Sequence, residues 1–184
     1  MANKIKYGLR NVYYAVATEG TGGALSYATP VALPGAVNLS LSQEGETSIF
    51  YADDVGYYQS VSNNGYSGTL ELALIPDSFK SSVLGETVDT SGVYIEKSDV
   101  TPKEFALLFE FQGDQAATRH AMYRCTVSRP DVAGATKEAS IEPQTETLNI
   151  TALPRINDYL VKASCPQSAT TAYSSWYSAV YTTA

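Results

Sequence analysis

The sequence has very few of the side chains that carry most enzyme chemistry. It contains one histidine, His120, and two cysteines, Cys125 and Cys165, which lie 40 residues apart. Two distant cysteines form neither a disulfide framework nor a zinc-binding pattern, and we expect Cys125 to be a buried free thiol. The glycine-rich run 20–23 is not followed by the Lys-Ser/Thr and helix of a phosphate-binding loop. We therefore expect no catalytic residue, no cofactor and no metal, and a protein that is not an enzyme.

Basic side chains are also scarce. Lys and Arg together number 12 against 19 Asp and Glu, which gives a formal net charge of −7 and an isoelectric point of about 4.6. Affinity for nucleic acid requires a basic surface, so this balance argues against direct binding of DNA or RNA. Most acidic domains are acidic for solubility alone. The functional alternative is a surface that must repel DNA.

Long apolar runs are missing as well. No window of the sequence approaches the length of a membrane span, and residues 1–14 lack the apolar segment of a signal peptide. We therefore expect no contact with a membrane and a protein that is made in a cytoplasm.

The residues that are abundant favour strands. The chain has 14 tyrosines and many Val, Thr and Ser residues, which suit a pleated surface. Alternation of apolar and polar residues predicts strands at 11–18, 36–42, 47–52, 55–61, 69–75, 93–96, 104–112, 118–129, 145–152 and 158–163. One short helix is predicted at 76–85, because proline stands at its start, glycine at its end and an apolar stripe between them. The predicted fold is mainly β, a sandwich or barrel with one flanking helix.

The length of 184 residues predicts a single domain over 1–184, with a flexible N-terminal arm at 1–11 and a C-terminal arm at 164–184. Within the second arm, 164–175 is expected to be a tether. The aromatic residues of the arm must pack onto something to be stable, and these are Trp176, Tyr177 and Tyr181.

Two patterns predict which side chains reach the core. The alternation in 69–75 predicts a core face that consists of Leu70, Leu72 and Leu74. The pattern in 118–129 predicts one shared face for Ala121, Tyr123, Cys125 and Val127. The strand at 104–112 is apolar on both faces, so we expect it to lie in the centre of the sheet.

The segment 49–75 combines an aromatic and acidic half with a core strand. Its first half is expected to form two short strands, or the two arms of one long projecting hairpin around Ala52-Asp53-Asp54. Tyrosine-rich surfaces suit protein contacts. The hypothesis is an assembly contact made by Phe50, Tyr51, Asp53, Asp54, Tyr57 and Tyr58. A turn at 62–65 is expected to separate this surface from the core strand.

The acidic residues of this region do not predict a catalytic pair. Adjacent residues of a strand point to opposite faces, so Asp53 and Asp54 would not act together. Together with Glu44 and Glu46 they offer oxygens to a divalent cation, but no calcium-loop pattern is present. The simpler interpretation is a solvated hairpin tip, and the functional alternative is that these acids line a surface that must stay unattractive to DNA.

Seven segments and the end of the chain resemble a known family. They occur in order along the sequence and read KIKYGLRNVYYA, PVALPGAVNLSLS, FYADDVGYY, NNGYSGTLELALIPDSF, PKEFALLFEFQGD, ATRHAMYRCTVSRP and IEPQTETLNITA, with WYSAVY near the end. This set resembles the major tail tube protein of long-tailed (siphovirus-type) bacteriophages.

The resemblance implies a virion protein that is assembled in the host cytoplasm. Copies are expected to join into hexameric rings by continuing their sheets, and the rings are expected to stack into a hollow tube. Phe50 to Tyr58 would form the contact between rings, and Glu44, Glu46, Asp53 and Asp54 would include acids that face the lumen. The expected partners are further copies of the chain, the tape measure protein, the tail terminator and the tail tip proteins. DNA is expected to pass through the lumen without specific binding.

Two other interpretations stay open at this point. A head–tail connector or a decoration protein would be a different structural role for a similar β-rich chain. A small hydrolase would need a nucleophile–base pair around His120, which the sequence does not supply. A histidine near a strand end and the surface explains His120 more simply.

Overall fold

The structure is a computed structural model that describes residues 5–114, 116–136 and 143–182, and its fold is mainly β. One antiparallel sheet contains nine strands in the order β2–β1–β10–β11–β12–β7–β4, with β3 paired to β1 and β13 paired to β11. Its strands are β1 (Leu9–Glu19), β2 (Leu25–Tyr27), β3 (Val31–Ala32), β4 (Ala36–Glu44), β7 (Gly65–Leu72), β10 (Phe105–Phe111), β11 (Arg119–Val127), β12 (Glu146–Leu153) and β13 (Lys162–Cys165). Two hairpins stand apart from it, β5 (Thr47–Ala52) with β6 (Val55–Val61), and β8 (Thr87–Val88) with β9 (Tyr94–Ile95). The predicted fold class is confirmed.

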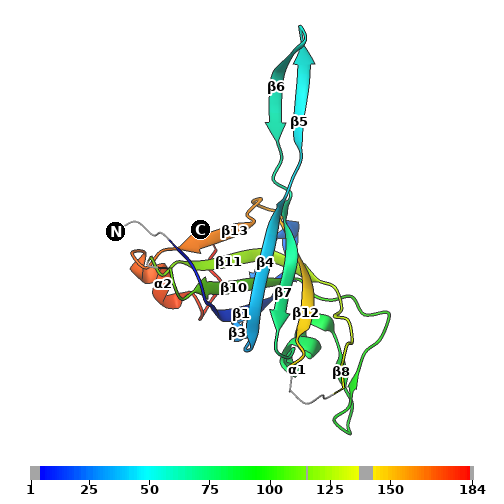
Figure 1. The fold of residues 1–184 in the computed structure, drawn as a ribbon. Helices are drawn as coiled ribbons and strands as arrows, with labels where there is room; N and C mark the ends of the chain where they lie inside the picture. The colour runs from blue at the N-terminus through cyan, green and yellow to red at the C-terminus, as the bar shows by residue number, and fades with distance from the viewer. Residues whose placement is uncertain (1–4, 115, 137–142, 183–184) are drawn as a thin grey trace.

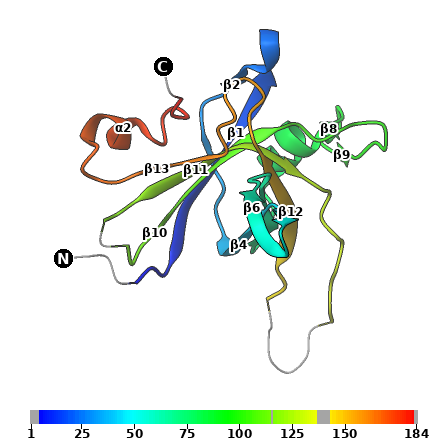
Figure 2. The same cartoon turned by 90° about the horizontal axis from the view of Figure 1, so that it is seen from above.

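The sheet bends over itself because β11 changes partner along its length. Its first half pairs with β13, from Arg119 to Met122, and its second half pairs with β12, from Arg124 to Val127. A register irregularity in the β10–β11 ladder accompanies the change. As a result β4, β7 and β12 run steeply across β1, β10 and β11 (Figure 1, and Figure 2 from above). The two halves of one sheet thus form a sandwich-like body.

Strand β10 lies at the centre of this body and is covered on both faces. Phe105, Leu107 and Phe109 point into the main core between the two halves of the sheet. Ala106 and Leu108 point into a second apolar cluster on the opposite face. The prediction of a central strand at 104–112 is confirmed.

Two predictions about core faces are wrong. In β11, Cys125 and Val127 belong to the main core together with Met122, whereas Ala121 belongs to the second cluster. The irregularity between Met122 and Cys125 shifts the alternation, so the expected common face with Tyr123 does not exist. In the strand predicted at 69–75, Leu70 and Leu72 are buried as expected.

Leu74 lies outside the observed strand β7, and its expected core position is also wrong. Strand β7 ends at Leu72, and Leu74 is 65% exposed. Ile75 is buried instead, and its backbone N–H donates to the Glu146 carboxylate at 2.6 Å. The chain leaves the sheet here and turns into the helix.

The predicted helix at 76–85 is present as two continuous segments. α1 (Asp77–Phe79) leads into η2 (Lys80–Leu84), a π-helical turn that ends at Gly85. The wider turn brings Phe79, Val83 and Leu84 to the same buried side. Phe79 packs edge-on against Tyr14 and Phe105, with ring centroids 4.9 and 5.6 Å apart. The helix closes one end of the main core. Among the described residues, no helix has the length and apolar character needed to cross a membrane.

The chain ends are more structured than the predicted arms. Residues 9–11 belong to β1, and the carbonyls of Tyr7 and Gly8 accept hydrogen bonds from the backbone of 112–113. The predicted tether at 164–175 contains the end of β13 and α2 (Thr170–Ser175). Positions 1–4, 183 and 184 of the predicted arms lie outside the described residues.

The strand predicted at 158–163 begins later, at Lys162. A tight loop replaces its first part, because Arg155 and Asp158 form an ion pair and the Leu160 carbonyl accepts from the Arg155 N–H at 3.0 Å. Burial of Arg155, which is 4% exposed, fixes this loop against the body. The guanidinium lies 4.9 Å from the ring centre of Tyr123, so the cation also has an aromatic partner.

We predict that Gly68→Ala destabilises the body by about 1–3 kcal/mol or more. Gly68 faces Leu41 in the β4–β7 ladder, and an added Cβ would overlap the Ser40 carbonyl oxygen. The two strands would have to separate locally, and such strain typically costs about 1–3 kcal/mol or more. Chemical denaturation measures the change. Gly134→Ala is the matched control, because nothing lies within 4 Å of its added Cβ. Equal stability of the two variants would contradict the prediction.

Candidate assembly interface

The most distinctive feature of the molecule is a long ribbon that leaves the body. Strands β4, β5, β6 and β7 follow one another so that β5–β6 continues the β4–β7 pair outward (Figure 1). The chain reverses at Asp53 and Asp54, whose φ angles are +50° and +61°. Two residues with positive φ form the tight turn whose twist suits a hairpin, and Asp tolerates this conformation well. The alternative of one projecting hairpin, left open by the sequence, is confirmed.

A narrow joint connects the ribbon to the body. The Ser62 N–H donates to the Glu46 carbonyl at 3.0 Å, and the Ser62 hydroxyl accepts from the Glu46 N–H at 2.8 Å. The Asn64 N–H donates to the Glu44 carbonyl at 2.8 Å, so the ladder resumes on the body side of the joint. The chain therefore continues along the ribbon through segment 62–65 without reversing its direction. The prediction of a turn at 62–65 is wrong.

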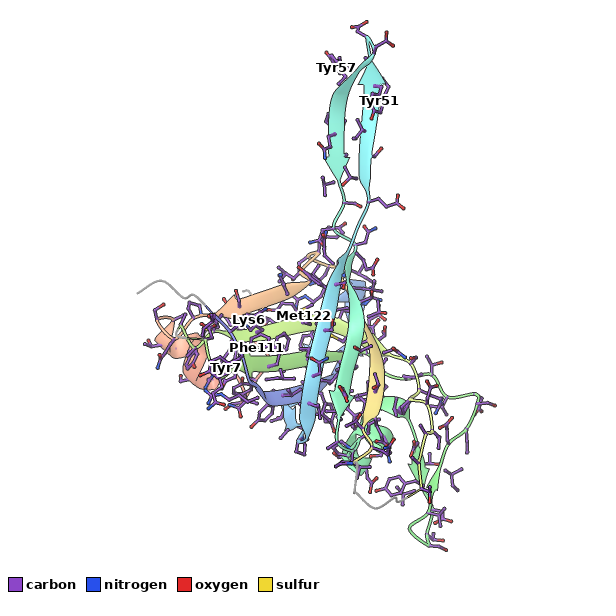
Figure 3. All side chains as sticks on the ribbon, viewed as in Figure 1. Lys6, Tyr7, Tyr51, Tyr57, Phe111 and Met122 are labelled. Carbon is purple, nitrogen blue, oxygen red and sulfur yellow. The ribbon has the colours of Figure 1, made fainter. Side chains whose placement is uncertain are left out.

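The aromatic and apolar side chains of the ribbon are exposed to solvent. Every residue of β5 and β6 is exposed except Ala52, which is partly buried. The large exposed side chains are Ile49, Phe50, Tyr51, Val55, Tyr57, Tyr58 and Val61, and Tyr57 reaches 73% exposure. Figure 3 shows Tyr51 and Tyr57 near the tip, far from the body. Because single exposed apolar residues are common but a contiguous set is not, this surface is the best candidate for a protein contact.

The four acids that the sequence singled out lie at three levels of the ribbon. Asp53 and Asp54 form its tip, Glu46 lies in the joint, and Glu44 ends β4, where its carboxylate accepts from the Ser67 hydroxyl. A strand rise of about 3.3 Å per residue places the tip roughly 30 Å from Glu44. Within 5–114, 116–136 and 143–182, no group of three His, Cys, Asp or Glu residues could hold a metal ion. The four acids therefore do not share one site.

In the described part of the body, four strands of the sheet pair with one neighbour only. Two of them, β2 and β3, pair with β1, and the two longest are β4 and β13. β4 pairs only with β7, and β13 pairs only with β11. Each presents unpaired backbone groups on its outer side, and such edges favour pairing with another chain. Sequence patterns alone did not predict which strands would be outermost, because edge position depends on tertiary pairing.

A buried carboxylate holds the C-terminal segment against the sheet. Glu110 in β10 is only 3% exposed. Its carboxylate accepts hydrogen bonds from Asn11 at 2.7 Å, Arg119 at 3.1 Å and the Tyr177 hydroxyl at 3.2 Å, and Arg10 lies 2.8 Å away. Burial raises the pKa of Glu110, but the hydrogen bonds from Arg119 and Asn11 and the charges of both arginines outweigh it, so the pKa lies below its ordinary value. Burial and the Glu110 charge raise the pKa of Tyr177.

The same cluster positions the aromatic end of the chain. The Arg119 guanidinium lies 3.7 Å from the ring centre of Tyr173 in α2 and donates to its carbonyl. Tyr177 stacks on Tyr13 at 4.6 Å. Trp176, which is 1% exposed, lies in the second cluster and stacks on Tyr181 at 5.9 Å. These are the aromatic residues that the sequence required to pack, whereas Glu110 gave no signal in the sequence.

His120 lies in β11, partly buried, with its ring stacked on Phe109 at 5.2 Å. Burial is the largest effect on its pKa and lowers it. Cys125 is fully buried, and burial raises its pKa to about 12, so its thiol is protonated at neutral pH. The placement of Cys125 agrees with the expected buried free thiol.

Neither a comparison with protein-family models nor a comparison with curated proteins finds a match for this chain.

We predict that Glu110→Gln makes the protein less stable at neutral pH, by on the order of 3 kcal/mol, because two arginines lose a buried anion. The folded pKa of Glu110 is below the unfolded value of about 4.3. Its contribution is therefore full above that unfolded value and is lost as pH falls through the folded pKa. Unfolding curves of both proteins from pH 7 to pH 3 should converge toward acid.

Glu96→Gln is the matched control. The Glu96 carboxylate also pairs with an arginine, Arg129, but 55% of its side chain is exposed. Exposed pairs contribute about 0–1 kcal/mol, so this variant should unfold nearly as the parent does. A gap between parent and Glu110→Gln that stays constant down to pH 3 would contradict the assigned role.

Proposed function

We propose that this chain is a structural subunit that polymerises, as stacked rings, into the hollow tail tube of a long-tailed bacteriophage. In this proposal the protein belongs to the virion, is assembled in the host cytoplasm, and lets DNA pass without specific binding. Its partners are other copies of the chain and the tape measure, terminator and tip proteins.

The projecting ribbon is the observation that carries the proposal. A two-stranded hairpin is marginally stable alone in water, and this one exposes nearly all of its side chains. If a second copy covered the aromatic surface, burial of that apolar area would stabilise the contact by about 25 cal/mol per Å². The ribbon lies far from the body of its own chain, so its partner must come from another molecule (Figure 3).

Two further observations support assembly. The open edges of β4 and β13 lie on different strands, so a contact between them would be head-to-tail. Head-to-tail contacts close into rings when the rotation allows it and give filaments when it does not. A formal charge of −7 per copy favours a tube whose surface repels DNA and lets it slide.

We predict that replacing Tyr57 and Tyr58 by serine leaves a folded monomer that does not polymerise. Both side chains are exposed on the ribbon, so their loss does not disturb the core. Electron micrographs of the purified protein test for tubes, and circular dichroism tests for folding. Tyr94→Ser with Tyr159→Ser is the matched control, because it removes two exposed tyrosines outside the ribbon. Normal tubes from the ribbon variant would reject the contact.

The lumen role is proposed for Glu44 and Glu46 rather than for all four acids. Glu44 and Glu46 lie at the base of the ribbon. Asp53 and Asp54 lie at its tip, which we assign to the contact with another copy. We expect a density map of the tube to show acidic side chains along its bore, including at least one of these two glutamates. A neutral or basic bore would contradict this assignment.

A further inference from the structure

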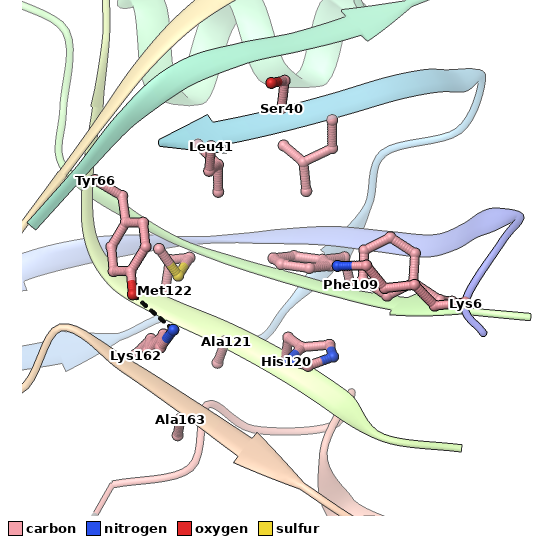
Figure 4. A pocket seen from close by; sticks show the side chains of 12 residues that line it. Lys6, Ser40, Leu41, Tyr66, Phe109, His120, Ala121, Met122, Lys162 and Ala163 are labelled. Carbon is pink, nitrogen blue, oxygen red and sulfur yellow. Dashed lines mark hydrogen bonds between the residues drawn. The ribbon is translucent and has the colours of Figure 1, made fainter. Parts of the chain in front are cut away.

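A cleft of about 380 Å³ opens between β4 and β13, where the two halves of the sheet diverge. Leucines of β4 form one wall, and side chains from β10 and β11 form the floor (Figure 4). Its apolar lining consists mainly of Leu39, Leu41, Phe109, Phe111 and Met122. The volume is large enough for a few side chains but not for a two-stranded ribbon, so only the end of an element could enter it.

The charges in this cleft are all of one sign. Lys6 and Lys162 are among its lining residues, and no Asp or Glu is. The Lys162 ammonium donates to the Tyr66 hydroxyl at 2.6 Å, and the Lys6 ammonium lies 4.9 Å from the ring centre of Phe111. Within the described residues, neither lysine belongs to an ion pair. The charge of Asp114 opposes the lowering of the His120 pKa, and the Asp114 carboxylate accepts hydrogen bonds from the backbone N–H groups of 116 and 118.

The tip of the ribbon has the opposite character. Asp53 and Asp54 form the turn, and no Lys or Arg occurs anywhere in 47–61. Tyr51 and Tyr57 flank the two acids and are exposed. In a chain with 12 cations and 19 anions, a cationic cleft with aromatic walls and an anionic tip with aromatic flanks are complementary in both charge and chemistry.

The two surfaces do not meet within one chain. The ribbon extends away from the body, whereas the labelled Lys6, Phe111 and Met122 lie on the body beside β4 (Figure 3). Contact therefore requires a second copy. Because tip and cleft are different surfaces, each copy could offer one of each, and such a head-to-tail contact can repeat from copy to copy.

We propose that the cleft between β4 and β13 receives the ribbon tip of another copy of this chain. Asp53 and Asp54 pair with Lys6 and Lys162, and an aromatic side chain of the tip packs against the apolar wall. The inference depends on the proposed function, because it names the acceptor of the contact that the ribbon makes. It assigns roles to Lys6 and Lys162.

Zero-length cross-linking of the unmodified chain tests the contact directly. A carbodiimide joins a carboxylate to an amine only when the two touch. We expect a peptide that contains Asp53 or Asp54 to be linked to one that contains Lys6 or Lys162. A mixture of ¹⁵N-labelled and unlabelled protein should show mixed-isotope links, which identifies them as intermolecular. Links from the tip to Lys97 or Lys103 instead, or no links from the tip, would overturn the proposal.

Charge reversal supplies an independent test. Lys6→Glu with Lys162→Glu should raise the concentration needed for assembly about tenfold or more, since like charges would meet. Asp53→Lys with Asp54→Lys should do the same, and all four changes together should restore assembly. Lys97→Glu with Lys103→Glu is the control of equal charge. Circular dichroism shows whether each variant is folded.

The outcomes separate the inference from the proposed function. If the unmodified chain forms tubes and the Lys6/Lys162 variant assembles like its control, the cleft is not the acceptor and the tube function stands. If the chain forms no tubes but the tip cross-links to the cleft, the contact stands and the tube function fails. Failure of the four-change variant to regain assembly, with every variant folded, would overturn the ion pairing.

Discussion

The rest of the molecule depends on the point in β11 where one partner strand gives way to another. The pairing with β13 ends at Met122, and the pairing with β12 begins at Arg124. A strand cannot pair with two neighbours that run in different directions unless its own backbone is irregular. The register shift in the β10–β11 ladder is this irregularity. Because the sheet diverges there, its two halves cross and enclose the main core. The same divergence leaves β4 and β13 as open edges with a cleft between them.

Much of this fold could be predicted from local patterns, because local patterns report alternation and turn chemistry. The strands around Leu107 and Leu148, the helix that buries Phe79 and the hairpin reversal at Asp53-Asp54 all have such signals. The expected faces of Tyr123 and Leu74 are wrong for a common reason. A bulge and an early strand end change which side a residue occupies without changing its local pattern.

The parts of the structure that the sequence did not predict depend on tertiary contacts. Residues 170–175 read as a polar tether, since Thr and Ser are weak helix formers and no apolar period is visible. The segment is helical because Tyr173 packs on Arg119, which in turn is held by Glu110 on the neighbouring strand. The aromatic and acidic hairpin was predictable from its local sequence, whereas the cationic cleft was not. Lys6 and Lys162 are far apart in sequence, and only the fold brings them to one cleft.

The ribbon and the body are stabilised by different interactions. The body buries its apolar side chains and satisfies Glu110 with four partners, so its stability is internal. The ribbon has no such core, and its order depends on continuing the β4–β7 ladder through the hydrogen bonds of Ser62 and Asn64. Its exposed aromatic surface raises the free energy of the isolated chain, and burial of that surface against another molecule would lower it. Substitutions in the ribbon should therefore alter association while leaving unfolding of the body unchanged, and substitutions in the body should alter both. The joint at 62–65 separates the body, which is stabilised by its own core, from the ribbon, which has no core. The ladder of hydrogen bonds nevertheless runs through this joint.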